Sequence, residues 1–174
     1  MTYKNKPIKN KILLLILAPA LVLLLSYLLP LKPTLTTPDV SFKTLKNETL
    51  DLKALKGKAV LITFWASNCP NCIKEIADFK HLYQAYQPRG LEIIAIAMSY
   101  DRPNYVVNTR QQYQIPYPIV LDLKGDLAKA FGGVSLIPTT FLINPQGDIA
   151  FQTLGTFDYD AMQARIEAML PIEM

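Results

Sequence analysis

The chain has 174 residues, a net charge of +4 and 51% apolar residues, which fits one ordinary domain and a further apolar segment. Its two cysteines and one histidine are too few for a disulfide-built scaffold or a four-ligand zinc site, so no metal is expected. Four lysines among the first eleven residues account for the net charge, so nucleic-acid binding is not expected either.

Residues 12–29 contain no charged side chain and follow a basic N-terminus of residues 1–11. As a helix these eighteen residues would span about 27 Å, close to the ~30 Å hydrocarbon core of a bilayer. We therefore predict a transmembrane signal-anchor over residues 12–30. Because the lysines precede it, residues 1–11 are expected in the cytoplasm and the rest of the chain outside. The alternative is a cleaved signal peptide, whose apolar region is normally ~7–15 residues long.

The segment after the anchor, residues 31–38, contains two prolines and is predicted to be an extended linker. A folded domain is expected over residues 39–174. It should begin with a β-hairpin formed by residues 40–45 and 49–52.

Strands and helices then alternate along the domain. Strands are expected over residues 59–65, 91–97 and 119–121, and helices over 70–86, 103–113 and 126–131, the last with Asp126 as its N-cap. Strand–helix–strand crossovers require parallel pairing. A hairpin of residues 139–143 and 149–154 adds antiparallel strands, and residues 158–170 form an amphipathic helix. The pattern predicts an α/β fold in which helices flank both faces of a mixed central β-sheet.

The two cysteines, Cys69 and Cys72, lie where a predicted buried strand meets the start of a helix, and Pro70 suits the first helical turn. Unpaired N–H groups and the helix dipole favour an anion at Cys69 and lower the pKa of its thiol, which makes Cys69 the expected nucleophile. Cys72 is near enough to form a disulfide with Cys69 and is the expected resolving thiol. The alternative is a pair of buried structural cysteines.

Three sequence features resemble the thioredoxin superfamily, and within it the TlpA/ResA/CcmG-like group of membrane-tethered, extracytoplasmic reductases. They are FWASNCPNC at residues 64–72, IPTTFLINP at residues 137–145, and Glu75, three residues after Cys72. An insertion after the second central strand, at about residues 99–118, is the fourth shared feature. The resemblance covers roughly residues 39–170 and implies a thioredoxin fold with this insertion.

The resemblance also implies a substrate-binding surface around a cis peptide bond between Ile137 and Pro138 that faces the cysteines. The backbone of Ile137 would pair there with an extended substrate chain. An ordinary loop proline is the alternative, since X–Pro bonds are mostly trans. Trp65 is a third candidate for this surface, although we favour packing beneath the site for its side chain.

Glu75 is the candidate for proton transfer. The buried acid of cytosolic thioredoxins would fall at Thr63, which cannot play that role. Glu75 lies one helical turn beyond Cys72, where burial would raise its pKa and allow it to move protons during exchange. The alternative is a solvated residue paired with Lys74 or Lys80.

These features predict a thiol–disulfide oxidoreductase without a bound cofactor, most simply a reductase of protein disulfides. The resemblance implies protein substrates of cytochrome c or copper-site maturation and a membrane protein as the thiol donor. It implies a single-pass protein of the bacterial cytoplasmic (inner) membrane whose catalytic domain faces the periplasm or the cell exterior. A disulfide-donating oxidase, a Cu(I)-binding module and a peroxiredoxin are the alternatives. Asn68 and the pair Pro70-Asn71 differ from the residues commoner in the group, which leaves potential and partner choice open.

Overall fold

The computed structural model describes Pro19 and residues 35–171. Apart from Pro19, the predicted signal-anchor lies outside the described residues, as do the predicted basic N-terminus and the first part of the linker. Within the described residues, no helix has the length and apolar character needed to cross a bilayer. The fold described below belongs to the unit of the chain that begins at Thr34.

In the described part of the chain, a mixed sheet has the strand order β1-β8-β7-β4-β5-β6. The parallel pairs are β4 with β5 and β5 with β6, whereas β7 pairs antiparallel with both β4 and β8. The predicted crossovers and the predicted C-terminal hairpin are thus confirmed. The strands are β1 (Leu35–Thr36), β4 (Ala59–Trp65), β5 (Leu91–Ala97), β6 (Ile119–Leu121), β7 (Thr139–Ile143) and β8 (Asp148–Leu154).

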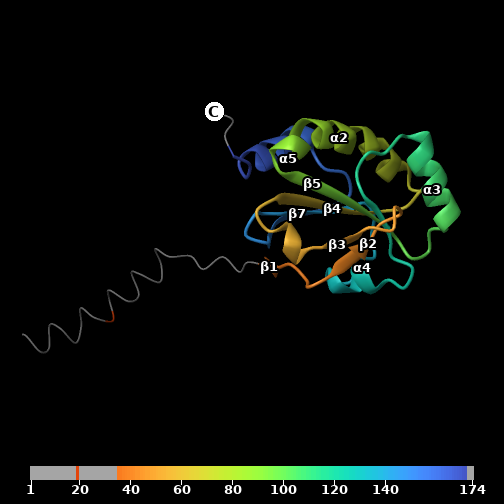
Figure 1. The fold of residues 1–174 in the computed structure, drawn as a ribbon, viewed down its shortest axis with the longest axis horizontal. Coiled ribbons are helices and arrows are strands. Elements are labelled where there is room, and N and C mark those ends of the chain that lie inside the picture. Colours follow the sequence, from red (N-terminus) through yellow and green to blue (C-terminus); the bar gives the residue numbers. More distant parts are fainter. Residues whose placement is uncertain (1–18, 20–34, 172–174) are drawn as a thin grey trace, which may run out of the picture. The chain divides into compact units, whose positions relative to one another are not determined.

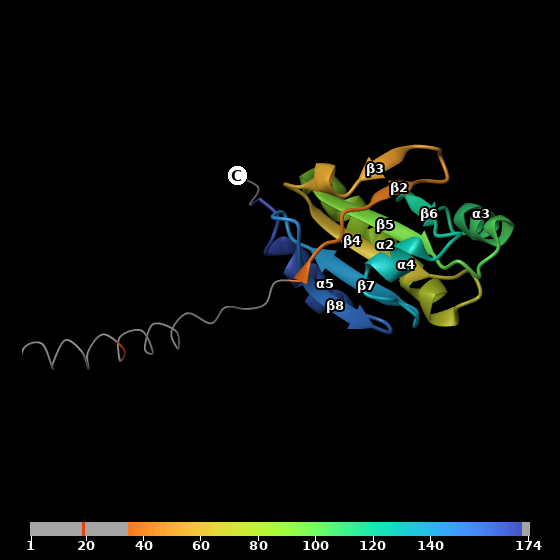
Figure 2. The ribbon, with the colours of Figure 1, turned by 90° about the horizontal axis from the view of Figure 1, so that it is seen from below.

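Helices cover both faces of this sheet, as predicted. Helices α2 and α5 lie on one face, and α4 lies on the other (Figures 1 and 2). Two buried clusters separate these layers, one beneath α2 and α5 and one beneath α4. The helices are α2 (Pro70–Tyr86), α3 (Pro103–Gln112), α4 (Asp126–Ala130) and α5 (Tyr159–Glu167), with 3-10 turns η1 (Lys53–Leu55) and η2 (Gln87–Arg89).

Strand β4 shows why its sequence is continuously apolar. All seven of its residues are buried, and successive side chains point to opposite faces of the sheet. Leu61 and Trp65 belong to the cluster beneath α2, while Ile62 and Phe64 belong to the cluster beneath α4. Because both faces are covered, no position in β4 is left for a solvated side chain.

The N-terminal hairpin consists of β2 (Ser41–Lys43) and β3 (Thr49–Asp51), as predicted. It lies against the outer edge of β6 on the face that carries α4 (Figure 2). Thr44 forms an antiparallel bridge with Val120, and the Leu45 N–H donates to the Ile119 carbonyl over 2.9 Å. The hairpin therefore satisfies edge groups of β6 that would otherwise be open to pairing with another chain.

The cap of α4 differs from the prediction. Asp126 is the first residue of the helix, Gly125 is its N-cap, and Asp126 makes no side-chain cap hydrogen bond. The carboxylate of Asp122 takes that role, accepting from the N–H groups of Leu127 (3.1 Å) and Ala128 (2.8 Å). The reason is the turn at Gly125, whose φ of +74° lets the chain bring the earlier aspartate over the helix start.

Candidate active site

Cys69 is the N-cap of α2, and Cys72 lies in the first turn of that helix. A disulfide joins them, with 5.3 Å between their Cα atoms. The Cys72 N–H donates to the Cys69 sulfur over 3.2 Å. Cys69 is partly exposed, whereas Cys72 is 4% exposed. A substrate disulfide can therefore reach Cys69, and a thiolate there would receive both an N–H and the positive end of the helix dipole.

The turn before Cys69 has its own set of contacts. The Cys69 N–H donates to the Ala66 carbonyl over 3.1 Å. Between them, the Ser67 N–H and hydroxyl both donate to the carboxylate of Asp101, over 2.6 and 2.7 Å. Asp101 comes from the insertion after β5, so two segments 34 residues apart meet directly beside the nucleophile. We did not predict this contact, since nothing in the sequence pairs the two residues.

The peptide bond between Ile137 and Pro138 is cis, as the resemblance implies. Thr139, the next residue, pairs with Phe64, so Pro138 lies beside the end of β4 that leads into the cysteine turn, residues 66–69. The Pro138 carbonyl accepts from the Gly155 N–H over 2.8 Å. The main chain of Ile137 makes no hydrogen bond within the described residues. Its N–H and carbonyl are thus available to an extended chain.

Trp65 lies beneath the cysteine pair, as the packing interpretation expected. It is the last residue of β4 and is 4% exposed. It lines a cavity of about 10 Å³ under Cys72, and its Nε1 has no hydrogen-bond partner within the described part of the chain. A cavity of this size is suited to about one water molecule.

Glu75 lines the same cavity and is 3% exposed. Its Oε1 accepts from the Phe157 N–H over 2.9 Å, while Oε2 is buried without a hydrogen-bond partner in the described residues. Burial raises the pKa of Glu75 to about 7, opposed by the Phe157 hydrogen bond and assisted by the charge of Asp78. The solvated alternative is wrong, because Glu75 is buried and forms no ion pair with Lys74 or Lys80 among the described residues.

The other polar residues of the cavity carry no charge near neutral pH. Thr63 accepts a hydrogen bond of 3.1 Å from the Thr140 hydroxyl, so the position of the thioredoxin acid is occupied by a neutral pair. Tyr117 is 3% exposed, and burial together with the nearby Glu75 raises the pKa of its phenol. Glu75 is therefore the single group lining this cavity that is suited to exchange a proton with Cys72 near neutral pH.

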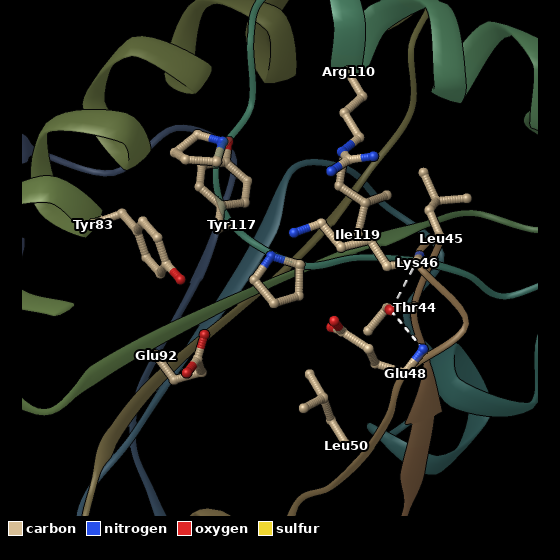
Figure 3. A pocket seen from close by; sticks show the side chains of 12 residues that line it. Thr44, Leu45, Lys46, Glu48, Leu50, Tyr83, Glu92, Arg110, Tyr117 and Ile119 are labelled. Carbon is tan, nitrogen blue, oxygen red and sulfur yellow. Dashed lines mark hydrogen bonds between the residues drawn. The ribbon is translucent and has the colours of Figure 1, made fainter.

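Tyr117 also lines a larger surface pocket of about 220 Å³ (Figure 3). Tyr83 forms another wall, and Arg110 extends into the pocket from α3 (Figure 3). None of the predicted site residues lines this pocket. It therefore stands apart from the cysteine site, although Tyr117 belongs to both.

Comparisons with known proteins agree with this geometry. The model of the AhpC/TSA family matches residues 34–152. The thiol-disulfide oxidoreductase ResA of Bacillus thuringiensis subsp. konkukian (strain 97-27) is 30% identical over 134 residues, covering 77% of this chain and 76% of that protein. A thioredoxin-family thiol:disulfide interchange protein from Chlorobium tepidum TLS superposes with a TM-score of 0.72 at 26% identity, covering 79% and 97% of the two chains. StoA from Bacillus subtilis superposes with a TM-score of 0.63 at 28% identity, covering 72% of this chain and 93% of StoA.

Proposed function

The chain belongs to the AhpC/TSA family and is a thiol–disulfide oxidoreductase of thioredoxin fold, and from this premise we propose that it reduces protein disulfides outside the cytoplasm. The observation that carries the proposal is the buried carboxyl of Glu75, one helical turn beyond Cys72 and in the same cavity. A reductase must deprotonate its resolving thiol in every cycle, and this carboxyl is placed to accept that proton.

The reaction begins when the Cys69 thiolate attacks one sulfur of a substrate disulfide. The substrate S–S bond breaks, a Cys69–substrate disulfide forms, and the departing substrate thiolate takes up a proton from solvent. Cys72 then loses its proton to Glu75 and attacks the Cys69 sulfur. The second substrate thiol leaves, and two electrons have passed from the protein to the substrate. The product is the Cys69–Cys72 disulfide observed in the structure.

The oxidised protein has to be reduced again by another thiol system. The chain contains only these two cysteines, so an internal relay through a third one does not exist. We infer that a membrane thiol donor supplies the electrons, and that the substrates are apocytochrome c or copper-site proteins, as the resemblance implies. What supports this location is the sequence pattern of a lysine-rich N-terminus followed by the charge-free run of residues 12–29.

Trapping of partners tests the proposal. The Cys72→Ala variant keeps the nucleophile but lacks the thiol that resolves the mixed disulfide, so substrates should accumulate on Cys69. The matched control, Cys69→Ala, removes the attacking sulfur and should trap none. Diagonal electrophoresis and mass spectrometry identify the captured chains. If Cys72→Ala captures no more protein than Cys69→Ala, the proposal is wrong.

The location is tested with a reporter enzyme fused after Met174. We expect the reporter to be active outside the cytoplasmic membrane and to sediment with it. A mature N-terminus near residue 30 or beyond would replace the anchor with a cleaved signal peptide.

A further inference from the structure

The carboxylate of Asp101 is a buried charge for which the proposed exchange reaction has no assigned use. Its side chain is in the turn that follows β5, and Asp101 is 8% exposed. No ion pair of Asp101 occurs among the described residues. Instead, each of its oxygens accepts one short hydrogen bond from Ser67. A buried carboxylate normally requires such bonds, because desolvating a charge without them is costly.

We propose that Asp101 is a positioning residue for disulfide exchange. It holds the turn before Cys69 against the insertion that follows β5, so that the nucleophile and the surface beside it keep one relative position. The proposal rests on the proposed function, because it concerns the reaction of Cys69 with substrate disulfides. It assigns Asp101 no contact with the reacting sulfur atoms.

The backbone around the turn shows what the carboxylate adds. At the start of the turn, the Trp65 carbonyl accepts from the Met98 N–H over 3.0 Å. At its end, Cys69 enters α2. Ser67 lies between these points, and its two hydrogen bonds to Asp101 are the ones that join the middle of the turn to another segment. Without them the residue two positions before the nucleophile would be free to move.

Asp101 also lines a surface concavity of about 310 Å³ that includes Asn68, the residue before Cys69. Two tyrosines of the insertion present large exposed side chains there, Tyr100 at 59% and Tyr105 at 48%. The guanidinium of Arg102 lies 5.8 Å from the centre of the Tyr105 ring. A protein substrate that contacts this surface would therefore be held against a wall that Asp101 fixes relative to Cys69. The lining residues are Asn68, Tyr100, Asp101, Arg102 and Tyr105.

The two parts of this proposal give different kinetic signatures. A displaced nucleophile slows attack on every disulfide, including one too small to contact the concavity. A displaced insertion slows attack only on substrates that dock. Because Asp101 joins the two, its loss should slow both kinds of reaction, and the larger loss should fall on the protein substrate.

The test uses the reduced full-length protein in a mild detergent, with glutathione disulfide as the small substrate and insulin as the protein substrate. We expect Asp101→Ala to lower the second-order rate constant roughly tenfold with glutathione disulfide and roughly 100-fold with insulin. Ser67→Ala loses only the hydroxyl contact, so its rate constants should lie between those of the unchanged protein and those of Asp101→Ala. If Asp101→Ala does not fold, Asp101→Asn, which keeps one acceptor oxygen, should show the same pattern with smaller losses.

Asp122→Ala is the matched control. Asp122 is also a buried carboxylate, 4% exposed, with two backbone hydrogen bonds, but it caps α4 and has no bond to the cysteine turn. It should lose stability and retain both rate constants. The proposal is overturned if Asp101→Ala matches Asp122→Ala, if both substrates slow equally, or if only one slows. If the unchanged protein reduces neither substrate, the proposed function fails instead.

Discussion

Replacement of Glu75 by glutamine should remove a pH dependence from the stability of the protein. Burial holds the pKa of Glu75 at about 7 in the folded chain, against an ordinary value of 4.5. Because folding raises this pKa, the protonated carboxyl is the form that the folded protein favours. Its stabilising contribution is therefore fully present below pH 4.5 and is lost as the pH rises through about 7.

The magnitude follows from the same two values. The difference between about 7 and 4.5, at about 1.36 kcal/mol per pKa unit, corresponds to about 3 kcal/mol of unfolding free energy. Glu75 is only 3% exposed, so solvent screening does little to reduce this figure. Glutamine has nearly the same shape and no charge to desolvate, and its amide oxygen can still accept from the Phe157 N–H.

Urea unfolding of the oxidised proteins between pH 4 and pH 8 measures the effect. The disulfide is kept intact so that neither cysteine titrates. We expect the unchanged protein to lose about 3 kcal/mol relative to Glu75→Gln across this range. Glu48→Gln, at an exposed position, is the control and should run parallel to the unchanged protein. If the difference between the unchanged protein and Glu75→Gln stays constant with pH, the pKa of Glu75 is not raised toward neutral, and its assignment as the acceptor of the Cys72 proton loses its basis.

Three further outcomes are expected. In the reduced protein, iodoacetamide should label Cys69 before Cys72 near neutral pH, and the opposite order would reverse their roles. Equilibration with a dithiothreitol series should give a potential nearer the ~−270 mV of a thioredoxin than the ~−120 mV of a strong oxidant, and a value above about −150 mV would favour the oxidase alternative. Asp122→Ala should lower the unfolding free energy by about 1–2 kcal/mol in urea, the loss expected for a helix cap, and no loss would leave the cap assignment without support.

The elements of this fold were predictable where one physical rule governed a segment. The apolar run of β4 has one explanation, burial on both faces, and all seven of its residues are buried in the structure. The start of α2 was equally well marked, because Pro70 fits only the first helical turn. The cap of α4 was not, since the choice between Asp122 and Asp126 depends on how the chain turns through Gly125. A capping residue can be read from local sequence only when the path before the helix is known.

The features of the site were likewise predictable only where they depend on residues close together in the sequence. That Glu75 shares a helical face with Cys72 follows from a spacing of three residues. That its carboxyl is buried depends on Phe157, 82 residues further along the chain, whose N–H satisfies one oxygen. The tie between Ser67 and Asp101 likewise joins residues 34 apart. Such contacts are created by the packing of elements, so no motif within either segment predicts them.

The exposure of the two sulfurs bears on how electrons pass through the protein. Cys72 is buried at 4% exposure, so we expect the substrate and the proposed thiol donor both to form their mixed disulfides with Cys69. The two partners therefore use one surface in turn and exclude each other. At that surface the Cys69 thiolate is stabilised by the N-terminus of α2. The one histidine, His81, is exposed further along the same helix and does not adjoin the cysteines. An ionised Glu75 would oppose the thiolate. We therefore expect the disulfide to be favoured over the dithiol, as a reductant requires, and the dithiothreitol equilibration measures this balance.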